Sequence, residues 1–222
     1  MKVSAYSLLY AIGAIASVLL IDRLAARISV EKIKARVICS ILIPSGLLGS
    51  MLLVYIFKIL IPANLYVSEG SSMFGGVITA IIMIFVLSKA MKIPVRVGYD
   101  LIMTALPLGF SIGKLGCLMA GCCAGDFSGI PVQIISSIAD LLILMIMLRS
   151  FKINGSDGLQ VFRFCSLYGL KRFLEGFFRI DAPRNLAGFS IFQWFGVAFF
   201  ICGLSFLILI SAARKHLQQR QI

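Results

Sequence analysis

The stretch Ser111-Ile-Gly-Lys-Leu-Gly-Cys-Leu-Met-Ala-Gly-Cys-Cys-Ala-Gly125 ends a long apolar run and carries one cation, four glycines and three of the six cysteines. Glycine lets backbones approach closely and adopt positive φ, and polar main chain at membrane depth must be satisfied by protein rather than lipid. We interpret the stretch as the floor of a binding or reaction pocket at one membrane face. The alternative is a helix-packing seam with a re-entrant turn, because small residues are common at membrane helix interfaces.

Composition places the chain in the membrane. Its 222 residues are 60% hydrophobic and only 14% charged, and the mean hydropathy is +1.02, outside the range of soluble domains. We predict an all-α polytopic membrane protein with a single domain over residues 1–222. The net charge of +12 is attributed to the positive-inside effect and to anionic lipid, and no nucleic-acid partner is expected.

The apolar segments predict seven transmembrane helices, each about long enough for about 30 Å of hydrocarbon. They cover residues 5–21, 37–61, 73–91, 99–120, 132–148, 159–178 and 189–212. Basic residues concentrate in the first, third and fifth links and in the C-terminal tail, so these are predicted to be cytoplasmic and the N-terminus to lie outside. This topology puts the 111–125 stretch on the outer side.

A second charged cluster lies on that side, where cations are unusual. The cluster comprises Lys171, Arg172, Glu175, Arg179, Asp181 and Arg184. Within it, Arg172, Glu175 and Arg179 are spaced i, i+3 and i+7, which predicts one helical face. One interpretation is a self-paired polar stripe. The other is an anion site, because a guanidinium fork against an apolar wall suits a phosphate. We expect Lys114 and Arg172 to share one anionic headgroup.

Other polar residues within the apolar segments have structural and functional interpretations. Asp140 lies in the middle of its segment and is either a functional residue or the partner of Arg163; we expect the pairing with Arg163. Gln133 and Gln193 either line the same pocket or bond neighbouring backbones. Gly75 and Gly76 are expected to pack against segment 99–120.

Cys117, Cys122 and Cys123 suggest soft-metal or thiol chemistry only weakly. Adjacent cysteines are a poor geometry for a shared tetrahedral site, and no C-x-x-C motif is present. The sole histidine, His216, lies in the C-terminal tail. We therefore predict no metal and no cofactor.

Six motifs, taken in chain order, resemble the prolipoprotein diacylglyceryl transferase family over nearly the whole chain. They are Phe74-Gly-Gly76, Gly113-Lys-Leu-Gly116, Pro131-Val-Gln133, Tyr168-Gly-Leu-Lys-Arg-Phe173, Phe178-Arg-Ile-Asp181 and Phe189-Ser-Ile-Phe-Gln193. The cysteine-rich form of the 111–125 stretch resembles a divergent branch of that family.

The resemblance implies a seven-helix transferase of the bacterial plasma membrane. Such enzymes move the diacylglyceryl group of phosphatidylglycerol to the thiol of a lipobox cysteine in an exported protein, and glycerol phosphate leaves. From the residues and the resemblance together, we expect catalytic roles for Arg172, Lys114, Glu175 and Cys117. The implied substrate-binding residues are Tyr168, Gly113, Gly116, Gly75, Gly76, Gln133, Gln193 and Arg179.

Several positions depart from the family pattern. Lys114 stands where the family has Arg, Cys117 where it has Asn, and Phe74 where it has a His that is a candidate base. The family carboxylate corresponds to Gly176, and Glu175 comes one residue earlier. Two alternatives therefore stay open: a lipid-binding or accessory membrane protein of the same fold, and a thiol-dependent enzyme that uses Cys122 or Cys123.

Overall fold

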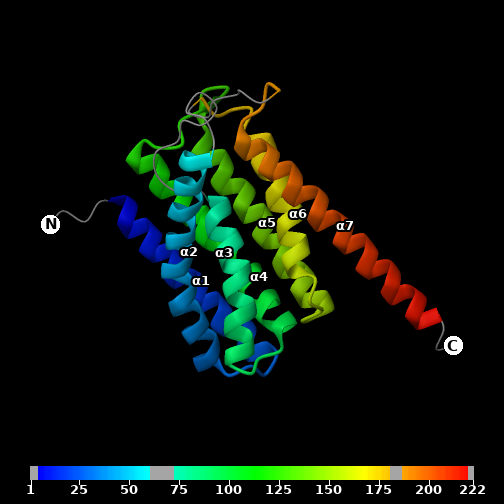
Figure 1. Cartoon of the computed structure of the whole chain (residues 1–222). Coiled ribbons are helices and arrows are strands. Elements are labelled where there is room, and N and C mark those ends of the chain that lie inside the picture. Colours follow the sequence, from blue (N-terminus) through cyan, green and yellow to red (C-terminus); the bar gives the residue numbers. More distant parts are fainter. Residues whose placement is uncertain (1–4, 61–72, 181–186, 220–222) are drawn as a thin grey trace.

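The computed structural model describes residues 5–60, 73–180 and 187–219, in which seven helices pack as a bundle (Figure 1). The structure does not describe some residues named in the predictions above: residue 61, Asp181, Arg184 and the side chain of His216. A strand pair, β1 (Asp126–Phe127) with β2 (Ile130–Pro131), lies in the link after α4. The helices are α1 (Ala5–Arg27), α2 (Lys32–Leu60), α3 (Met73–Ala90), α4 (Val95–Ala120), α5 (Val132–Asn154), α6 (Gln160–Glu175) and α7 (Ile191–Gln219).

The predicted all-α membrane fold is confirmed, with one difference in helix length. Six of the seven helices are long and apolar enough to cross a membrane. The exception is α6, whose 16 residues extend only about 24 Å at 1.5 Å per residue. This helix was predicted over 159–178, but it ends at Glu175. Conversely, α5 continues to Asn154 instead of ending near residue 148. A count of seven full spans stays a prediction.

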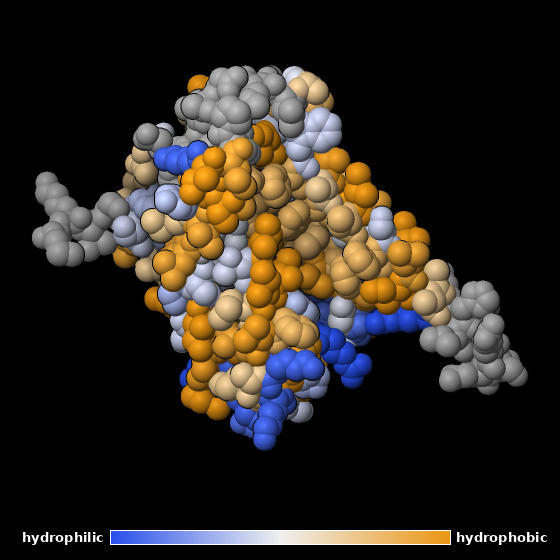
Figure 2. All heavy atoms as spheres, in the orientation of Figure 1, coloured by the Kyte–Doolittle hydropathy of each residue, from blue (hydrophilic) through white to orange (hydrophobic). Residues whose placement is uncertain are grey.

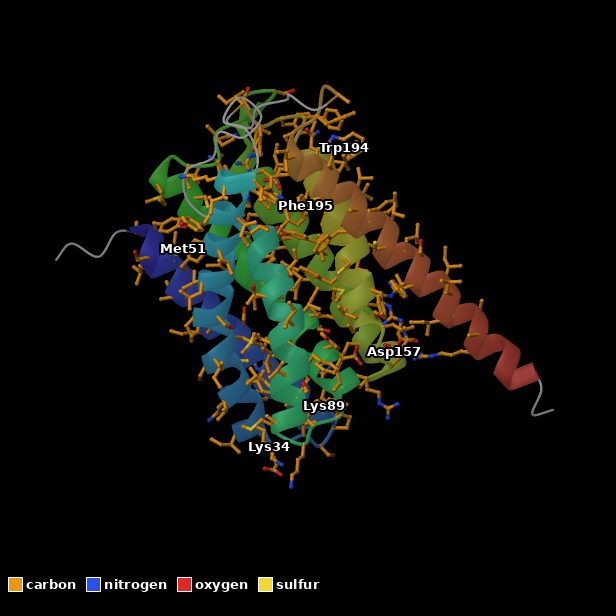
Figure 3. All side chains as sticks on the ribbon, viewed as in Figure 1. Lys34, Met51, Lys89, Asp157, Trp194 and Phe195 are labelled. Carbon is orange, nitrogen blue, oxygen red and sulfur yellow. The ribbon has the colours of Figure 1, made fainter. Side chains whose placement is uncertain are left out.

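Charge and apolar surface separate along the bundle. Large exposed aliphatic and aromatic side chains are spread over α1, α2, α5 and α7, as expected for surface that faces lipid. Figure 2 shows apolar side chains over the middle of one face and the largest hydrophilic areas at its lower end. Lys34 and Lys89 lie at this basic end, and Trp194 lies at the other (Figure 3). This separation agrees with the alternation of links on which the predicted orientation rests.

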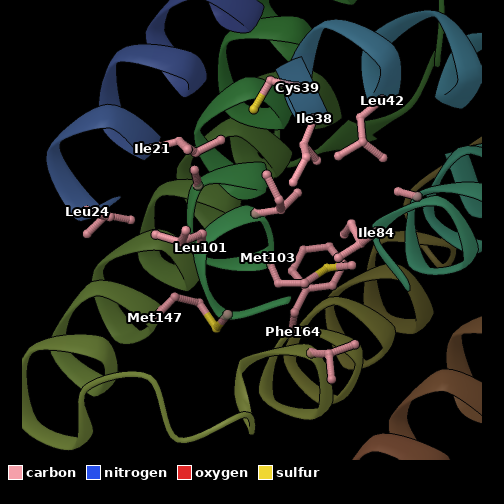
Figure 4. Packing of buried hydrophobic residues seen from close by; sticks show 14 of the residues in the cluster. Ile21, Leu24, Ile38, Cys39, Leu42, Ile84, Leu101, Met103, Met147 and Phe164 are labelled. Atoms are coloured by element: carbon pink, nitrogen blue, oxygen red, sulfur yellow. The ribbon is translucent and has the colours of Figure 1, made fainter. Parts of the chain in front are cut away.

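The core is formed where α1 to α6 meet. Ile21, Ile38, Ile84, Met103 and Phe164 converge from five helices (Figure 4) and are each at most 4% exposed. Beside them, aromatic rings contact one another toward the other end of the bundle. Phe164 and Tyr168 stack with ring centroids 5.2 Å apart, and Phe74 meets Tyr168 edge to face at 6.1 Å. This aromatic column leads to the charged cluster described below.

Glycines let α2 and α3 pack backbone to backbone. A Cβ atom on Gly75 would collide with the carbonyl oxygen of Gly49 and lie 2.7 Å from Leu53 Cβ, and one on Gly76 would lie 3.2 Å from Gly46 O. The expectation that this glycine pair packs against segment 99–120 was therefore wrong, because its closest contacts are on α2. The small-residue seam typical of membrane helix pairs explains both glycines.

Substituting Gly75 tests this seam. Gly75→Ala should lower the free energy of unfolding by about 1–3 kcal/mol, because the new methyl group meets backbone that cannot move aside. Gly46→Ala is the matched control on the same seam, since its Cβ would lie at an ordinary 3.9 Å from Gly76 O. Thermal unfolding in detergent measures both variants. Equal unfolding temperatures for the two would contradict this packing.

Candidate functional site

Five charged side chains from α4, α5 and α6 meet in the interior near one end of the bundle. Lys114 Nζ donates a hydrogen bond to Glu175 Oε1 at 3.0 Å, and Arg172 Nη1 lies 3.1 Å from the same oxygen. Lys171 Nζ bonds Asp140 Oδ2 at 2.9 Å and lies 3.4 Å from Glu175 Oε2. All five residues are at most 8% exposed. The two stretches expected to fold over each other therefore meet, with a protein carboxylate between their cations.

The end of α6 fixes Glu175 in this position. Gly176 donates its N–H to the carbonyl of Arg172, and a Cβ atom on Gly176 would collide with the side chain of Gln193 on α7. A side chain at position 176, where the family pattern places its carboxylate, would therefore require Gln193 to move. At position 175 the carboxylate instead folds back on Arg172 with i, i+3 spacing.

The cluster carries an excess of positive charge. Three cations, Lys114, Lys171 and Arg172, face two carboxylates, Asp140 and Glu175, which leaves a formal charge of +1. An uncompensated charge in a low-dielectric interior is costly. The cluster is therefore suited to an additional anion.

Polar atoms next to these charges lack partners among the described residues. Tyr168 Oη, Arg172 Nε and Asp140 Oδ1 are buried without a hydrogen bond. Buried polar groups in native proteins are almost always paired with protein or water. Three such atoms around one charged cluster indicate a place where water or a polar ligand completes the bonding.

Phe74 forms an apolar wall of this cluster. Its side chain is fully buried, and the guanidinium carbon of Arg172 lies 5.7 Å from its ring centroid. A cation over an aromatic face is held electrostatically. Phe74 thus orients Arg172, but it supplies no proton acceptor where the family has a His.

A small pocket adjoins Arg172 and is lined by Gly176, Arg179, Ser190, Phe192 and Gln193. Ser190 and Gln193 form a capping box at the start of α7, because Ser190 N donates to Gln193 Oε1 at 2.9 Å and Gln193 N donates to Ser190 Oγ at 3.3 Å. Gln193 therefore fits both predicted roles, because it bonds the backbone of a neighbouring residue and lines the pocket.

Arg179 does not share a helical face with Arg172 and Glu175, because α6 ends at Glu175. That prediction was wrong. Arg179 instead pairs with Gly125 in an antiparallel bridge. This bridge joins the link after α6 to the cysteine-rich link after α4.

The three cysteines converge in that link. Gly121, with φ of 68°, ends α4 in the left-handed region, and Cys123 adopts a φ of 59°. This double reversal brings the sulfur atoms of Cys117, Cys122 and Cys123 within 4.8 Å of one another. The sequence had argued against such a shared geometry. A hydrogen bond with Cys117 lowers the pKa of the Cys123 thiol, with Lys114, Arg179 and Arg172 adding to the effect and burial opposing it.

The remaining candidate residues lie in helix contacts. A Cβ atom on Gly113 or Gly116 would meet Tyr10 or the backbone of Tyr6 on α1 at 3.3–3.4 Å. Gln133 Nε2 donates to the carbonyl of Cys122 at 2.7 Å, while its Oε1 is buried without a hydrogen bond in the described structure.

The expected Asp140–Arg163 pair was wrong. Asp140 pairs with Lys171, and Arg163 pairs with Asp157, 2.7 Å away near the basic end. Lys171 was expected to belong to the outer charged cluster, without a named partner. Its i, i+4 spacing to Glu175 was the available signal. Likewise, Ser190-x-x-Gln193 is a recognisable capping box that could have predicted the start of α7.

The fold and this cluster define a multi-pass membrane protein with an ionic site at one end of its bundle. The profile of the family described as Prolipoprotein diacylglyceryl transferase matches residues 1–209, and the chain belongs to that family.

Relatives named phosphatidylglycerol–prolipoprotein diacylglyceryl transferase cover most of the chain. The Clostridium tetani protein is 25% identical over 97% of this chain and 96% of its own length. The Geobacter sulfurreducens protein is 28% identical over 93% and 90%. One from Dehalococcoides mccartyi is 29% identical over 79% and 77%.

Removing one buried carboxylate tests the energetics of the cluster. Asp140→Ala should lower the free energy of unfolding by about 3–5 kcal/mol, because Lys171 is left buried without its closest partner. Asp140→Leu combined with Lys171→Met should recover part of this loss. Lys34→Ala is the control, since its pair with Glu31 is exposed and contributes at most about 1 kcal/mol. Similar unfolding temperatures for Asp140→Ala and Lys34→Ala would contradict the role of the pair.

Proposed function

We propose that the protein is a diacylglyceryl transferase of the bacterial plasma membrane that moves the diacylglyceryl group of phosphatidylglycerol to a cysteine thiol of an exported lipobox protein. The observation that carries this proposal is the buried cluster at Glu175, with its excess positive charge and unpaired polar atoms. Family membership and the names of the relatives support it. In this proposal all seven helices span the membrane, the N-terminus and the cluster lie outside, and the C-terminus is cytoplasmic.

The phosphate of the lipid would bind beside Arg172. The Nε of this residue has no hydrogen-bond partner in the described structure, and the pocket next to it includes Arg179. A guanidinium with a free edge can take a phosphate oxygen in a charge-assisted bond. As the carbon–oxygen bond breaks, negative charge grows on the leaving glycerol phosphate, and donors already aimed at it stabilise the transition state.

Glu175 would hold the two cations in place. Its Oε1 accepts from both Lys114 and Arg172, so the two side chains are oriented before the lipid arrives. Among the described residues, Tyr168 Oη and Gln133 Oε1 have no hydrogen-bond partner, so both are available to the glycerol hydroxyls. Gln193 would shape the pocket wall. The interfacial glycines Gly75, Gly76, Gly113 and Gly116 would contribute by allowing the helices that carry the site to approach closely.

A second candidate function is lipid binding without turnover. The observation that favours it is Phe74, which packs fully buried against Arg172 where the family has a candidate base. Tight phosphatidylglycerol binding with no product would identify that function. The thiol-dependent enzyme remains a third candidate because the three cysteines converge.

Substituting Arg172 tests the transferase. Arg172→Ala should lower the rate of diacylglyceryl transfer by about 100-fold or more, because it removes a donor to the developing charge. Arg172→Lys keeps the charge, loses the fork and should be intermediate. Transfer is measured as the mass gain of a lipobox peptide in phosphatidylglycerol vesicles. Arg163→Ala, which alters an ion pair near the basic end, is the control. Full activity of Arg172→Ala would reject the proposed role of this residue.

A further inference from the structure

We propose that Cys117, Cys122 and Cys123 form a binding site for a thiophilic divalent cation of the zinc class, with one coordination position open to the acceptor thiol. The role given to the acceptor thiol rests on the proposed transferase function. The ion-binding site itself rests only on the geometry of the three sulfurs.

The sulfur atoms already lie close to the spacing that such an ion requires. They are within 4.8 Å of one another. Zinc–sulfur bonds of about 2.3 Å in a tetrahedron place neighbouring sulfurs about 3.8 Å apart. The site therefore needs a contraction of about 1 Å or less, which rotation of the side chains can provide. Cys117 is buried and Cys122 is exposed. The three sulfurs therefore lie at the protein surface, where an ion can reach them from solvent.

The surrounding backbone holds the cysteines in this arrangement. Cys122 N donates to the carbonyl of Cys117 at 3.1 Å, and Gln133 Nε2 holds the carbonyl of Cys122 from α5. The residues after Cys123 are tied to the link after α6, where Ile180 N donates to the carbonyl of Ala124 at 3.1 Å. Contacts of this kind orient the ligands of metal sites. The left-handed φ of Cys123, which a non-glycine residue rarely adopts, fits a position under functional constraint.

The local charges favour the loaded site. Three thiolates with a divalent cation carry a net charge of −1, and a fourth thiolate makes it −2. Lys114 lies one helical turn before Cys117 on α4, and Arg179 belongs to the segment that pairs with Gly125, two residues after Cys123. Cations therefore flank the three cysteines.

Three ligands leave one position free. Within the described residues the convergent group contains three ligand side chains and no fourth, whereas closed structural zinc sites have four. A three-ligand site with an open position is typical of catalytic zinc. Thiolate ligands also select soft ions over magnesium or calcium.

The open coordination position would activate the acceptor thiol, for which the site has no base. Phe74 offers no base, and the acceptor must become a thiolate to act as a nucleophile. A thiol that binds the cation loses its proton, which passes to water at the outer surface. Its sulfur then forms a bond to the glyceryl carbon of the lipid. The carbon–oxygen bond to the phosphate breaks, and the electron pair leaves with glycerol phosphate. The product is a neutral thioether, a weaker ligand than a thiolate, and it dissociates.

Cobalt(II) titration of the reduced full-length protein in detergent tests the site. We expect one equivalent to bind with thiolate-to-cobalt charge-transfer absorption, and zinc to displace it. Cys117→Ser, Cys122→Ser and Cys123→Ser should each weaken binding at least about tenfold, while Cys202→Ser, at an exposed cysteine on α7, should leave it unchanged. Absence of the band, or an unchanged band in the three variants, would overturn the proposal. If the variants fail to fold, the site is tested in the wild-type protein by alkylation of these cysteines. Zinc should protect them, and equal alkylation with and without zinc would overturn the proposed site.

The role of the open position is tested separately. A lipobox peptide should change the cobalt spectrum, whereas its Cys→Ser analogue should not; no change with either peptide overturns that role. Transfer should be lost when chelation removes the metal and restored by zinc. Transfer by protein verified to be metal-free would overturn the inference but leave the transferase intact. No transfer in either form would reject the transferase, and the cobalt titration would still decide the metal site.

Discussion

The structure depends on one carboxylate oxygen, Glu175 Oε1, which accepts from both Lys114 and Arg172. These cations lie 58 positions apart in the chain, at residues 114 and 172, on helices that would otherwise have no reason to place two positive charges together. Two positive charges that contact the same oxygen atom repel each other strongly in a low-dielectric interior. The carboxylate between them makes the arrangement stable, and the same arrangement leaves Arg172 oriented for an anion.

The rest of the bundle keeps this cluster buried and fixed in place. Helix α6 is short and carries three of the five charged residues of the cluster, so it is unsuited to face lipid. Helices α4, α5 and α7 pack around it. The aromatic column through Phe164, Tyr168 and Phe74 fills the interior beneath the charges. Glycine seams bring α3 against α2 and α4 against α1. Burial in a low-dielectric interior strengthens the electrostatic interactions at the site.

The sequence predicted the helices and the meeting of Lys114 with Arg172, because hydropathy, basic links and motif order are encoded locally. It did not predict which charges pair. Asp140 and Arg163 were a reasonable pair because both were expected within the membrane-spanning segments. Arg163 instead bonds the nearby Asp157, and Asp140 bonds Lys171. Such a choice depends on the rotation of each helix about its axis, which periodicity does not fix. The cysteine cluster was missed for a similar reason: two left-handed residues reverse the chain, and backbone reversals of this kind are not visible in spacing alone.

The most direct test of the central claim is an experimental structure of the protein with bound phosphatidylglycerol, in which the position of the phosphorus atom is measured. We expect it beside Arg172, on the side of the pocket lined by Arg179 and Gln193, with Glu175 still between Lys114 and Arg172. A phosphorus atom at the basic end near Lys34 and Lys89, or a cluster in which Lys114 and Arg172 no longer share Glu175, would contradict the account.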